Sequence, residues 1–490
     1  PGLRRAYFER VAGRSDAELA ETFFNSVTRR LFNTVGVDHD IEFVTSALAE
    51  PPSPRVDQSA VTVSVPATPS LARAVEQVLA IGRWRSPFRR FEGDVAAVAG
   101  ELSATAAGHP VIALEFARTP FLRNKGAYLV GRLHTLAGAA PVAIALVNTP
   151  SGVAVDAVLT AEDDISIVFS FSHSYFLVET ACPSALVAFL RELMPRKPVS
   201  ELYASIGHNK HGKTEFYRAL LSHLEATDDR FEIAPGARGM VMVVFTMPGF
   251  DAVFKIIRDR FEPPKTATRA GVREKYAFVF GHDRAGRLVD AQEFEHLKFD
   301  RRRFSPALLD ELVAKAAGSV VVEDHSVAFE HVYTERRLTP LDLYLESAPP
   351  ALARAAVIDY GLAIRDLAAS NIFPGDLLVK NFGVSRHGRV IFYDYDELCL
   401  LSECRFRRLP PPRSYDDEIS AEPWFHVDDR DVFPEELLTF LGLRGGLRDL
   451  FAQAHADLLA PDFWIAMQEE HRAGHLPDLW PYPSSRRLTR

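Results

Sequence analysis

The stretch 371–398 reads NIFPGDLLVKNFGVSRHGRVIFYDYDEL, and it decides how the C-terminal half of this chain is interpreted. Asp376 and Asn381 are separated by four residues, and Asp394 follows after a turn (SRHGR) and a short apolar run. A single acidic residue on a loop is usually a turn former. Three polar positions framed by a loop, a strand and a second loop instead indicate side chains that converge on a metal ion and a reacting hydroxyl.

This spacing is typical of a protein-kinase active site. There an Asp accepts the hydroxyl proton of the substrate, an Asn holds a metal ion, and a later Asp binds magnesium. Asp376, Asn381 and Asp394 occupy the matching positions. Two departures stand beside them: Pro374-Gly375 replaces the usual His-Arg, and Asp394-Tyr395-Asp396 replaces the usual Asp-Phe-Gly.

Upstream of this segment, residues 230–236, 239–247 and 252–259 are predicted to form three consecutive strands. The first connection carries two glycines, so backbone N–H groups can approach phosphate oxygens closely there. Taken alone, glycines that join two strands are usually just a hairpin. With the later motif, the loop is predicted to bind nucleotide through Ala234, Pro235, Gly236, Ala237, Arg238, Gly239 and Met240.

Lys255 lies in the apolar strand AVFKIIRD, one hairpin after the glycine-bearing loop. A lysine there either reaches solvent from an edge strand or meets a buried anion. Its position favours the second interpretation, a lysine that pairs with the α- and β-phosphates of ATP. Residues 331–346 are predicted to form a strand, a hinge and a helix, with the backbone near Glu335 meeting the adenine edge.

The pattern as a whole predicts an α+β chain of two domains. Residues 1–229 read as a mixed α+β domain, and residues 230–490 as a protein-kinase-like bilobal domain. The second domain divides into a small β-rich lobe at about 230–337 and a larger helical lobe at about 338–490. A length of 490 residues agrees with more than one core.

Within the first domain, residues 15–35 predict an amphipathic helix, with Ser15 and Glu18 at capping-box spacing. Residues 109–180 carry five β patterns, the last of them SIVFSFS at 166–172. None of these segments contains a pattern that indicates a particular reaction or ligand.

Composition argues against several classes of protein. The chain has 65 acidic and 56 basic residues, a formal charge of −9, which is unlike a nucleic-acid binder. No stretch approaches the about 20 apolar residues of a membrane span. The cysteines, Cys182, Cys399 and Cys404, form no CxxC pair, so no disulfide framework is expected and a reducing cytoplasm fits best. Cys399 and Cys404 are interpreted as two thiols at the end of an apolar strand rather than half a metal site.

Residues 207–214, GHNKHGKT, match the phosphate-binding pattern GxxxxGKT. A true loop of that kind follows a buried strand and opens a helix. The segment after it is helical in pattern, but the polar segment before it reads as a helix rather than a strand. We therefore interpret the match as coincidence, while an ATPase that uses Lys213 stays open as an alternative.

Four segments together resemble bacterial isocitrate dehydrogenase kinase/phosphatase: 234–259, 286–297, 371–398 and 410–425. The resemblance covers most of the chain, which looks N-terminally short beside the family. It implies ATP with Mg²⁺, or Mn²⁺, in the kinase reaction, ADP or ATP in the phosphatase reaction, and AMP as an allosteric effector of the first domain. It also implies isocitrate dehydrogenase as the protein substrate, gripped by residues 404–433, and a homodimer by analogy.

The resemblance also assigns roles to single residues. It places ATP on residues 234–240 and Lys255, the catalytic step on Asp376, and metal on Asn381 and Asp394. Asp290, which would otherwise read as a helix N-cap, matches an acidic position used for catalysis, expected to be the phosphatase reaction. Asp396 is a candidate for orienting the attacking water in that reaction. A nucleotide-binding pseudokinase remains an alternative, because the His-Arg pair is missing and the Asp-Phe-Gly motif is altered.

Overall fold

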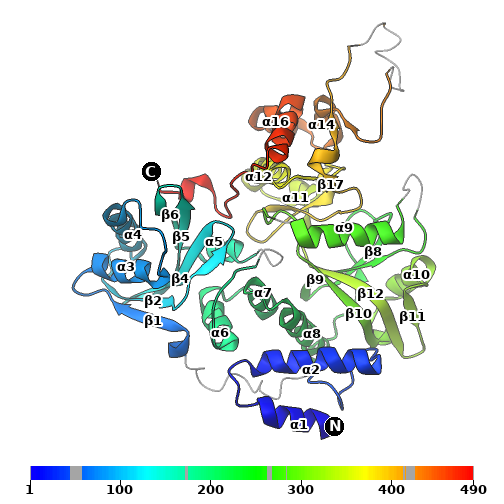
Figure 1. Ribbon diagram of the computed structural model, residues 1–490. Coiled ribbons are helices and arrows are strands. Elements are labelled where there is room, and N and C mark those ends of the chain that lie inside the picture. Colours follow the sequence, from blue (N-terminus) through cyan, green and yellow to red (C-terminus); the bar gives the residue numbers. More distant parts are fainter. Residues whose placement is uncertain are drawn as a thin grey trace. The chain divides into compact units, whose positions relative to one another are not determined.

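The computed structural model describes residues 2–44, 58–170, 175–261, 267–282, 284–411, 414 and 425–488. The chain divides into two compact units, residues 1–228 with 481–490, and residues 229–480 (Figure 1). Residues 481–490, expected from the sequence in the second domain, group with the first unit. In the described part of the chain, no helix has both the length and the apolar character that crossing a membrane requires.

The first unit is built on an antiparallel sheet of six strands, ordered β1-β2-β4-β5-β6 with β3 paired to β4. Valine and leucine side chains of two helices, α3 (Leu71–Leu79) and α4 (Phe91–Thr105), pack into the core of this sheet. The strands are β1 (Thr62–Pro66), β2 (Val111–Ala117), β3 (Phe121–Arg123), β4 (Gly126–Thr135), β5 (Gly138–Thr149) and β6 (Gly152–Leu159). The predicted β character of the region is confirmed for these strands.

The prediction of a strand at SIVFSFS (166–172) was wrong for those of its residues that the structure describes. Residues 166–168 end helix α5 (Glu162–Val168), whose first turn carries Glu162, Asp163 and Asp164. Acidic side chains stabilise a helix N-terminus through the helix dipole, and this local signal outweighs the β-branched residues that follow. Residues 171 and 172 lie outside the described part.

The remaining helices of the first unit are α1 (Gly2–Val11), α2 (Ala17–Phe32), α6 (Pro183–Leu193), α7 (Val199–Ser205) and α8 (Asn209–Ala226). The amphipathic helix expected at 15–35 is confirmed as α2, but Asp16 rather than Ser15 precedes its first turn, without a side-chain cap. The C-terminal residues join this unit through Asp156 of β6, which accepts hydrogen bonds from Tyr482 (2.8 Å) and Arg487 (2.8 Å).

The GHNKHGKT segment is not a phosphate-binding loop in this fold. Helix α7, not a strand, precedes it, as its polar pattern predicted. His211 is buried in the first turns of α8, where its Nδ1 lies 2.7 Å from the Thr22 hydroxyl and its Nε2 lies 3.6 Å from Glu215. Burial lowers the pKa of His211 from 6.5 to about 3, and Arg218 adds to the shift. The segment therefore serves the packing of α8 against α2.

The second unit begins with an antiparallel sheet ordered β10-β12-β9-β8-β7, with β11 paired to β12. Helix α9 (Arg269–His282) lies in sequence between β9 and β10, an arrangement typical of a protein-kinase small lobe. The strands are β7 (Glu232–Ile233), β8 (Met242–Met247), β9 (Phe250–Ile257), β10 (Ala291–Asp300), β11 (Val320–Val322) and β12 (Ser326–Arg336), and α10 (Pro306–Lys315) covers part of the sheet. The strands predicted in this region are confirmed, and β10 was missed.

The part after β12 is mainly helical, as expected, with short strand pairs around one long helix. Its helices are α11 (Leu341–Ser347), α12 (Pro350–Ala369), α14 (Pro434–Phe440), α15 (Gly445–Ala454) and α16 (Pro461–Arg472). Its strands are β13 (Thr339–Pro340), β14 (Ile372–Phe373), β15 (Phe382–Val384), β16 (Val390–Phe392), β17 (Cys399–Leu400), β18 (Arg405–Phe406) and β19 (Asp431–Val432). Residues 412, 413 and 415–424 of the predicted substrate loop lie outside the described part.

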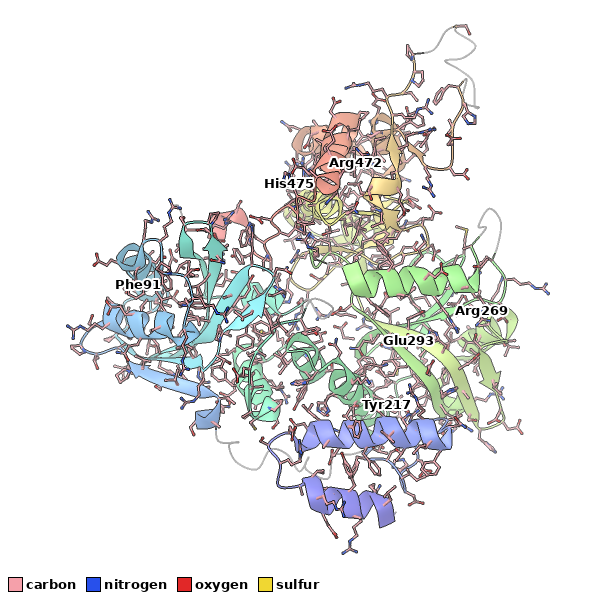
Figure 2. The ribbon with its side chains drawn as sticks, in the orientation of Figure 1. Phe91, Tyr217, Arg269, Glu293, Arg472 and His475 are labelled. Carbon is pink, nitrogen blue, oxygen red and sulfur yellow. The ribbon has the colours of Figure 1, made fainter. Side chains whose placement is uncertain are left out.

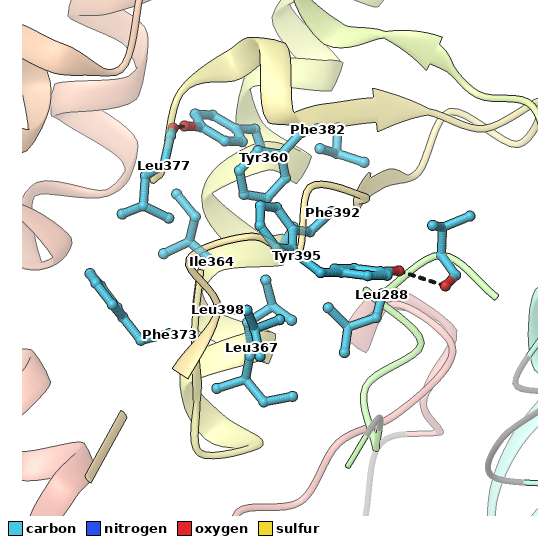
Figure 3. Packing of buried hydrophobic residues seen from close by; sticks show 14 of the residues in the cluster. Leu288, Tyr360, Ile364, Leu367, Phe373, Leu377, Phe382, Phe392, Tyr395 and Leu398 are labelled. Atoms are coloured by element: carbon cyan, nitrogen blue, oxygen red, sulfur yellow. Dashed lines mark hydrogen bonds between the residues drawn. The ribbon is translucent and has the colours of Figure 1, made fainter. Parts of the chain in front are cut away.

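Aromatic and aliphatic side chains from α12 and the short strands form one buried cluster beneath the motif segment (Figure 3). Tyr360 and Phe382 meet edge to face with ring centroids 4.9 Å apart, and Phe382 contacts Phe392 at 5.0 Å. These contacts hold β15 and β16 against α12, so the loops at their ends start from a rigid base.

Stability of the first unit should fall on acidification because His211 stays neutral in the folded state. Its folded pKa lies below its unfolded value, so the unfolded chain gains a proton first and stability is lost as pH falls from about 6.5 towards about 3. Between pH 7 and pH 5 this amounts to about 2 kcal/mol. Urea unfolding of wild type and His211→Gln at both pH values measures it: the variant should lose about 2 kcal/mol less. Equal losses in the two proteins would contradict the assignment.

Candidate active site

Lys255 and Glu335 form a buried ion pair at the centre of the second unit's sheet. The Lys255 ammonium lies 2.7 Å from Glu335 Oε2, and both side chains are less than a tenth exposed. Lys255 is on β9, with β8 on one side and β12 on the other, so the alternative of an exposed edge residue is wrong. Burial raises the pKa of Glu335, while Lys255 acts against that rise. A buried lysine with an anion as partner is the arrangement that its place in the strand indicated.

The partner of this lysine comes from a strand rather than from a helix. Tyr276 of α9 donates a hydrogen bond to Glu335 Oε1 at 3.2 Å, and its ring stacks on Tyr333 with centroids 3.8 Å apart. In protein kinases the corresponding acid lies on the helix after the lysine strand. Here β12 supplies the acid and α9 supplies a tyrosine that holds it. Glu335, predicted to meet adenine through the backbone, thus acts through its side chain on Lys255.

The Lys255 ammonium also reaches the motif segment. It donates a hydrogen bond to the carbonyl of Tyr393 at 2.9 Å, and that carbonyl belongs to the peptide that leads into Asp394. The ammonium lies 5.3 Å from the Tyr393 ring centroid and 5.8 Å from that of Tyr395. Lys255 and Asp394 are therefore neighbours in space, although 138 residues separate Lys255 from Tyr393.

Asn381 joins Asp376 to the Asp394 segment. The side-chain amide of Asn381 donates a hydrogen bond to the backbone carbonyl of Asp376 at 3.3 Å. The backbone carbonyl of Asn381 accepts a hydrogen bond from Tyr393 N–H at 3.1 Å. The Asp376 carboxylate accepts a hydrogen bond from Leu378 N–H at 3.0 Å, which orients it across the loop. The three residues of the motif thus come together through backbone contacts. Asn381 precedes β15 and Asp394 follows β16, so the antiparallel pairing of these two strands brings both residues to the same end of the pair.

Asp290 is brought to the same place by an added strand contact. Val289 N–H donates to the carbonyl of Phe392 at 3.0 Å, and the Tyr395 hydroxyl donates to the carbonyl of Val289 at 2.6 Å, the dashed bond in Figure 3. Asp290 follows Val289 directly and precedes strand β10, which begins at Ala291, so the helix N-cap interpretation is wrong. Its convergence with Asp394 follows from this contact, which sequence patterns cannot reveal.

A buried arginine anchors that segment to α12. Arg287 contacts Asp359 at 2.7 Å and Asp366 at 2.7 Å, and donates to the carbonyl of Val390 at 2.9 Å. The two carboxylates lie on one face of α12, seven residues apart. The side chains of Arg287, Asp359 and Asp366 are all charged and paired. Removing any one of them would leave a charge without its partner and destabilise the fold.

The predicted nucleotide loop spans Ala234–Met240 between β7 and β8, and most of it is exposed. Gly236 has φ +107°, a conformation that glycine adopts readily, and a Cβ on it would lie 3.6 Å from Pro340. Arg238, expected to add positive charge, instead pairs with Glu311 of α10 at 2.8 Å.

Gly375 explains why the usual His-Arg is replaced. It has φ +79°, and a Cβ on it would lie 2.6 Å from the carbonyl oxygen of Glu397. The loop that carries Asp376 therefore packs directly on the segment that carries Asp394 and Asp396. A side chain at position 375 would push the two carboxylate-bearing loops apart.

The donor set fits a magnesium nucleotide rather than an isolated metal ion. Among the described residues, no cluster of three His, Cys, Asp or Glu side chains could hold a metal by itself. Mg²⁺ commonly takes one or two protein oxygens and completes its shell with water and phosphate. Asn381 and Asp394 would supply those oxygens. Burial raises the pKa of Tyr276, and Glu335, Tyr395, Asp396 and Asp394 raise it further, so negative charge gathers on this side of the Lys255–Glu335 pair.

Three contributors to the site have no signal in the linear pattern: Tyr276, Tyr395 and Arg287. The side-chain role of Glu335 had only a weak signal. A buried lysine demands an acid, but β12 offers two, Glu330 and Glu335, and the structure shows that Glu335 is the buried one. Figure 2 shows Glu293 further along this sheet, where it pairs with His331 and not with Lys255.

Replacing Gly375 with alanine should impair the site more than the fold. The Cβ would meet Glu397 at 2.6 Å and the backbone would be strained, so we expect a loss of about 2–4 kcal/mol and at least about tenfold slower phosphoryl transfer. Gly388→Ala is a matched control, since Gly388 has φ +73° but open space around it. It should lose about 1 kcal/mol and keep its transfer rate. Thermal unfolding and a transfer assay compare them; equal effects would refute the packing argument.

Comparison with known proteins gives both units the same family. The profile for the regulatory domain of isocitrate dehydrogenase kinase/phosphatase (AceK) matches residues 1–228. The profile for the AceK kinase domain matches residues 229–484.

Two relatives and one solved structure extend this finding. Isocitrate dehydrogenase kinase/phosphatase of Anaeromyxobacter sp. (strain Fw109-5) is 51% identical over 493 residues, covering 99% of this chain and 85% of the relative. The protein of the same name from Anaeromyxobacter dehalogenans (strain 2CP-C) is 50% identical over 502 residues, covering 98% and 84%. A ROP18 kinase domain solved with AMP-PNP and sucrose matches at 11% identity with a TM-score of 0.25, covering 49% of this chain and 80% of that one.

Proposed function

The chain belongs to the isocitrate dehydrogenase kinase/phosphatase family, and on that premise we propose that it phosphorylates a serine of isocitrate dehydrogenase and removes the same phosphate. Such a switch directs carbon between the Krebs cycle and the glyoxylate bypass. The observation that carries the proposal is the convergence of Lys255, Asp376, Asn381 and Asp394 in a chain with this ancestry.

Nucleotide use follows from the kinase family, and we propose ATP with Mg²⁺, or Mn²⁺, as the phosphoryl donor and ADP or ATP as the nucleotide of the phosphatase reaction. When bound, the metal nucleotide supplies the transferable phosphoryl group and neutralises its charge. Lys255, held by Glu335, would bind phosphate oxygens, and residues 234–240 would cover them with backbone N–H groups. Asn381 and Asp394 would hold the metal.

Asp376 is proposed to accept the proton of the serine hydroxyl during phosphorylation. Its carboxylate is already oriented by Leu378 N–H, so it points from the loop without reorganisation. The pseudokinase alternative rests on the missing His-Arg and the altered Asp-Phe-Gly. Gly375 packing on Glu397 accounts for the first change, and the Tyr395 hydrogen bond to Val289 accounts for part of the second. Both departures support an assembled site.

For dephosphorylation we propose Asp290 and Asp396 as the acidic groups that orient and deprotonate the attacking water. Tyr395 separates Asp394 from Asp396 in sequence and is tied to Val289, the neighbour of Asp290. A kinase has glycine where this chain has Asp396. The additional carboxylate is therefore the feature that suits hydrolysis as well as transfer.

The remaining assignments concern regulation, partners and location. We propose that residues 1–229 respond to AMP, that residues 404–433 grip isocitrate dehydrogenase, and that the chain forms a homodimer by analogy with its family. A cytoplasmic location is proposed because its substrate is a metabolic enzyme. No nucleic-acid or membrane role is proposed, given the formal charge of −9.

The function is tested by incubating the purified chain with radiolabelled ATP, Mg²⁺ and isocitrate dehydrogenase. Wild type should label the substrate and release the label when ATP is replaced by ADP. Lys255→Ala should reduce transfer by at least about 100-fold, because Glu335 is left buried without its partner and the phosphates lose their cation. Lys213→Ala should transfer normally. ATP binding that is lost in Lys213→Ala but kept in Lys255→Ala would establish the ATPase alternative, and nucleotide binding without transfer would establish the pseudokinase.

Asp396→Ala should separate the two reactions. We expect phosphatase activity to fall by at least about tenfold while kinase activity changes by less than about threefold, because only hydrolysis needs the additional base. Glu397→Ala is a suitable control, since Glu397 is exposed at the neighbouring position. Release of labelled phosphate and transfer of label are measured on the same preparations. Equal losses of both activities in Asp396→Ala would remove this role.

A further inference from the structure

Two thiols lie side by side next to the active site. Cys399 and Cys404 have their sulfur atoms 3.6 Å apart, and both side chains are half-buried, within reach of a small solute. Cys399 is on β17 and Cys404 directly precedes β18, with a single helical turn, Leu401–Glu403, between them. The sequence predicted two unremarkable thiols here, and their spacing alone does not show that they meet.

The surrounding backbone holds the two sulfurs together. Cys404 N–H donates to the carbonyl of Leu401 at 3.1 Å, which closes the turn. The side-chain amide of Gln468, buried on α16, donates to the carbonyls of both Leu401 and Cys404 at 2.8 Å. On the other side, β17 pairs with β14, which places Cys399 opposite Phe373. The dithiol is therefore held by backbone and side-chain contacts on both sides, and Cys404 Sγ also contacts the carbonyl of Leu400 at 3.7 Å.

This dithiol sits between two segments that the reaction needs. Phe373 directly precedes Pro374 and the loop that carries Asp376. Leu398, next to Cys399, accepts a hydrogen bond from Lys275 of α9 at 2.6 Å. The same helix holds Glu335 through Tyr276. Movement of Cys399 would thus be transmitted to the catalytic loop and to the helix that supports Lys255.

We propose that Cys399 and Cys404 form a reversible disulfide when the protein meets a peroxide, and that this modification slows phosphoryl transfer. The disulfide stands on the dithiol geometry alone, whereas its effect on transfer rests on the proposed function. A transient disulfide of this kind is compatible with a reducing compartment, where such bonds act as redox sensors.

The chemistry proceeds in two balanced steps. The Cys399 thiolate attacks one oxygen of hydrogen peroxide, the O–O bond breaks, and a sulfenic acid and hydroxide are formed. The Cys404 thiol then attacks that sulfur, the S–S bond forms, and the sulfenic oxygen leaves as water with the Cys404 proton. Two thiols lose two electrons, and the peroxide is reduced to two molecules of water. A hydrogen bond from Cys404 lowers the pKa of Cys399, against burial and with help from Lys275, which suits Cys399 to the first attack.

The bond would change the local geometry. A disulfide has its sulfurs about 2.05 Å apart, so they must approach by about 1.5 Å. Gln468 restrains the Cys404 side, so the shift would fall on β17 and, through its pairing, on β14. A displacement of about 1 Å in a catalytic loop can reduce a rate substantially.

The test treats the full chain with a small excess of hydrogen peroxide, alkylates the remaining thiols and maps the peptides by mass spectrometry. We expect a peptide pair joined through Cys399 and Cys404, lighter by two hydrogen atoms and restored by dithiothreitol. Cys182 is the internal control, since its sulfur faces the Ser184 hydroxyl at 3.6 Å and not a second thiol. It should remain available for alkylation. Failure to find the Cys399–Cys404 bond while Cys182 is oxidised would overturn the proposal.

Activity is measured on the same samples. Oxidised wild type should transfer phosphate about tenfold more slowly and recover with dithiothreitol. Cys404→Ser and Cys399→Ser should resist the effect, while Cys182→Ser should behave as wild type. A disulfide that forms without any change in rate would overturn the regulatory half alone. If reduced wild type transfers no phosphate at all, the proposed function fails, and the mass measurement still decides whether the disulfide forms.

Discussion

The ion pair between Lys255 and Glu335 is the contact on which the rest of the second unit depends. Removing two charges from water is unfavourable unless the pair is close and its other hydrogen-bonding positions are filled. Here the pair is 2.7 Å apart, Tyr276 donates to the acid, and the carbonyl of Tyr393 accepts from the lysine. One lysine therefore connects β9, β12, α9 and the segment that carries Asp394. The sheet and the helical part of the unit share a single electrostatic centre.

That centre explains how the unit departs from the usual kinase motifs without losing their geometry. Because the acid comes from β12, α9 is free to carry a tyrosine, and that tyrosine packs on Tyr333. Because Gly375 has no side chain, the Asp376 loop can lie against Glu397. Because Tyr395 replaces phenylalanine, its hydroxyl can tie Val289 to the motif segment. Each of these departures is accompanied by a contact that joins two segments of the site.

The same rigidity makes the site sensitive to changes at its border. Short strands of two or three residues carry the loops of Asp376 and Asp394, and they are held by pairing, by the aromatic cluster beneath them and by buried side-chain bonds such as that of Gln468. A close-packed interior transmits displacement rather than absorbing it. The dithiol of Cys399 and Cys404 lies on this border, next to β14. The effect of a new S–S bond there would be transmitted through the pairing of β17 with β14 to the loop that carries Asp376.

The sequence by itself determined the relative placement of Asp376, Asn381 and Asp394, because their spacing depends only on a loop, a turn and one short strand. Local patterns also predicted α2 and most strands. The tertiary structure alone decided which distant groups meet these residues: Glu335 for Lys255, and Val289 beside Tyr395. The reason is physical. A pattern reports the neighbours of a residue along the chain, whereas the partner of a buried charge is chosen by strand pairing and packing, which join residues far apart in sequence.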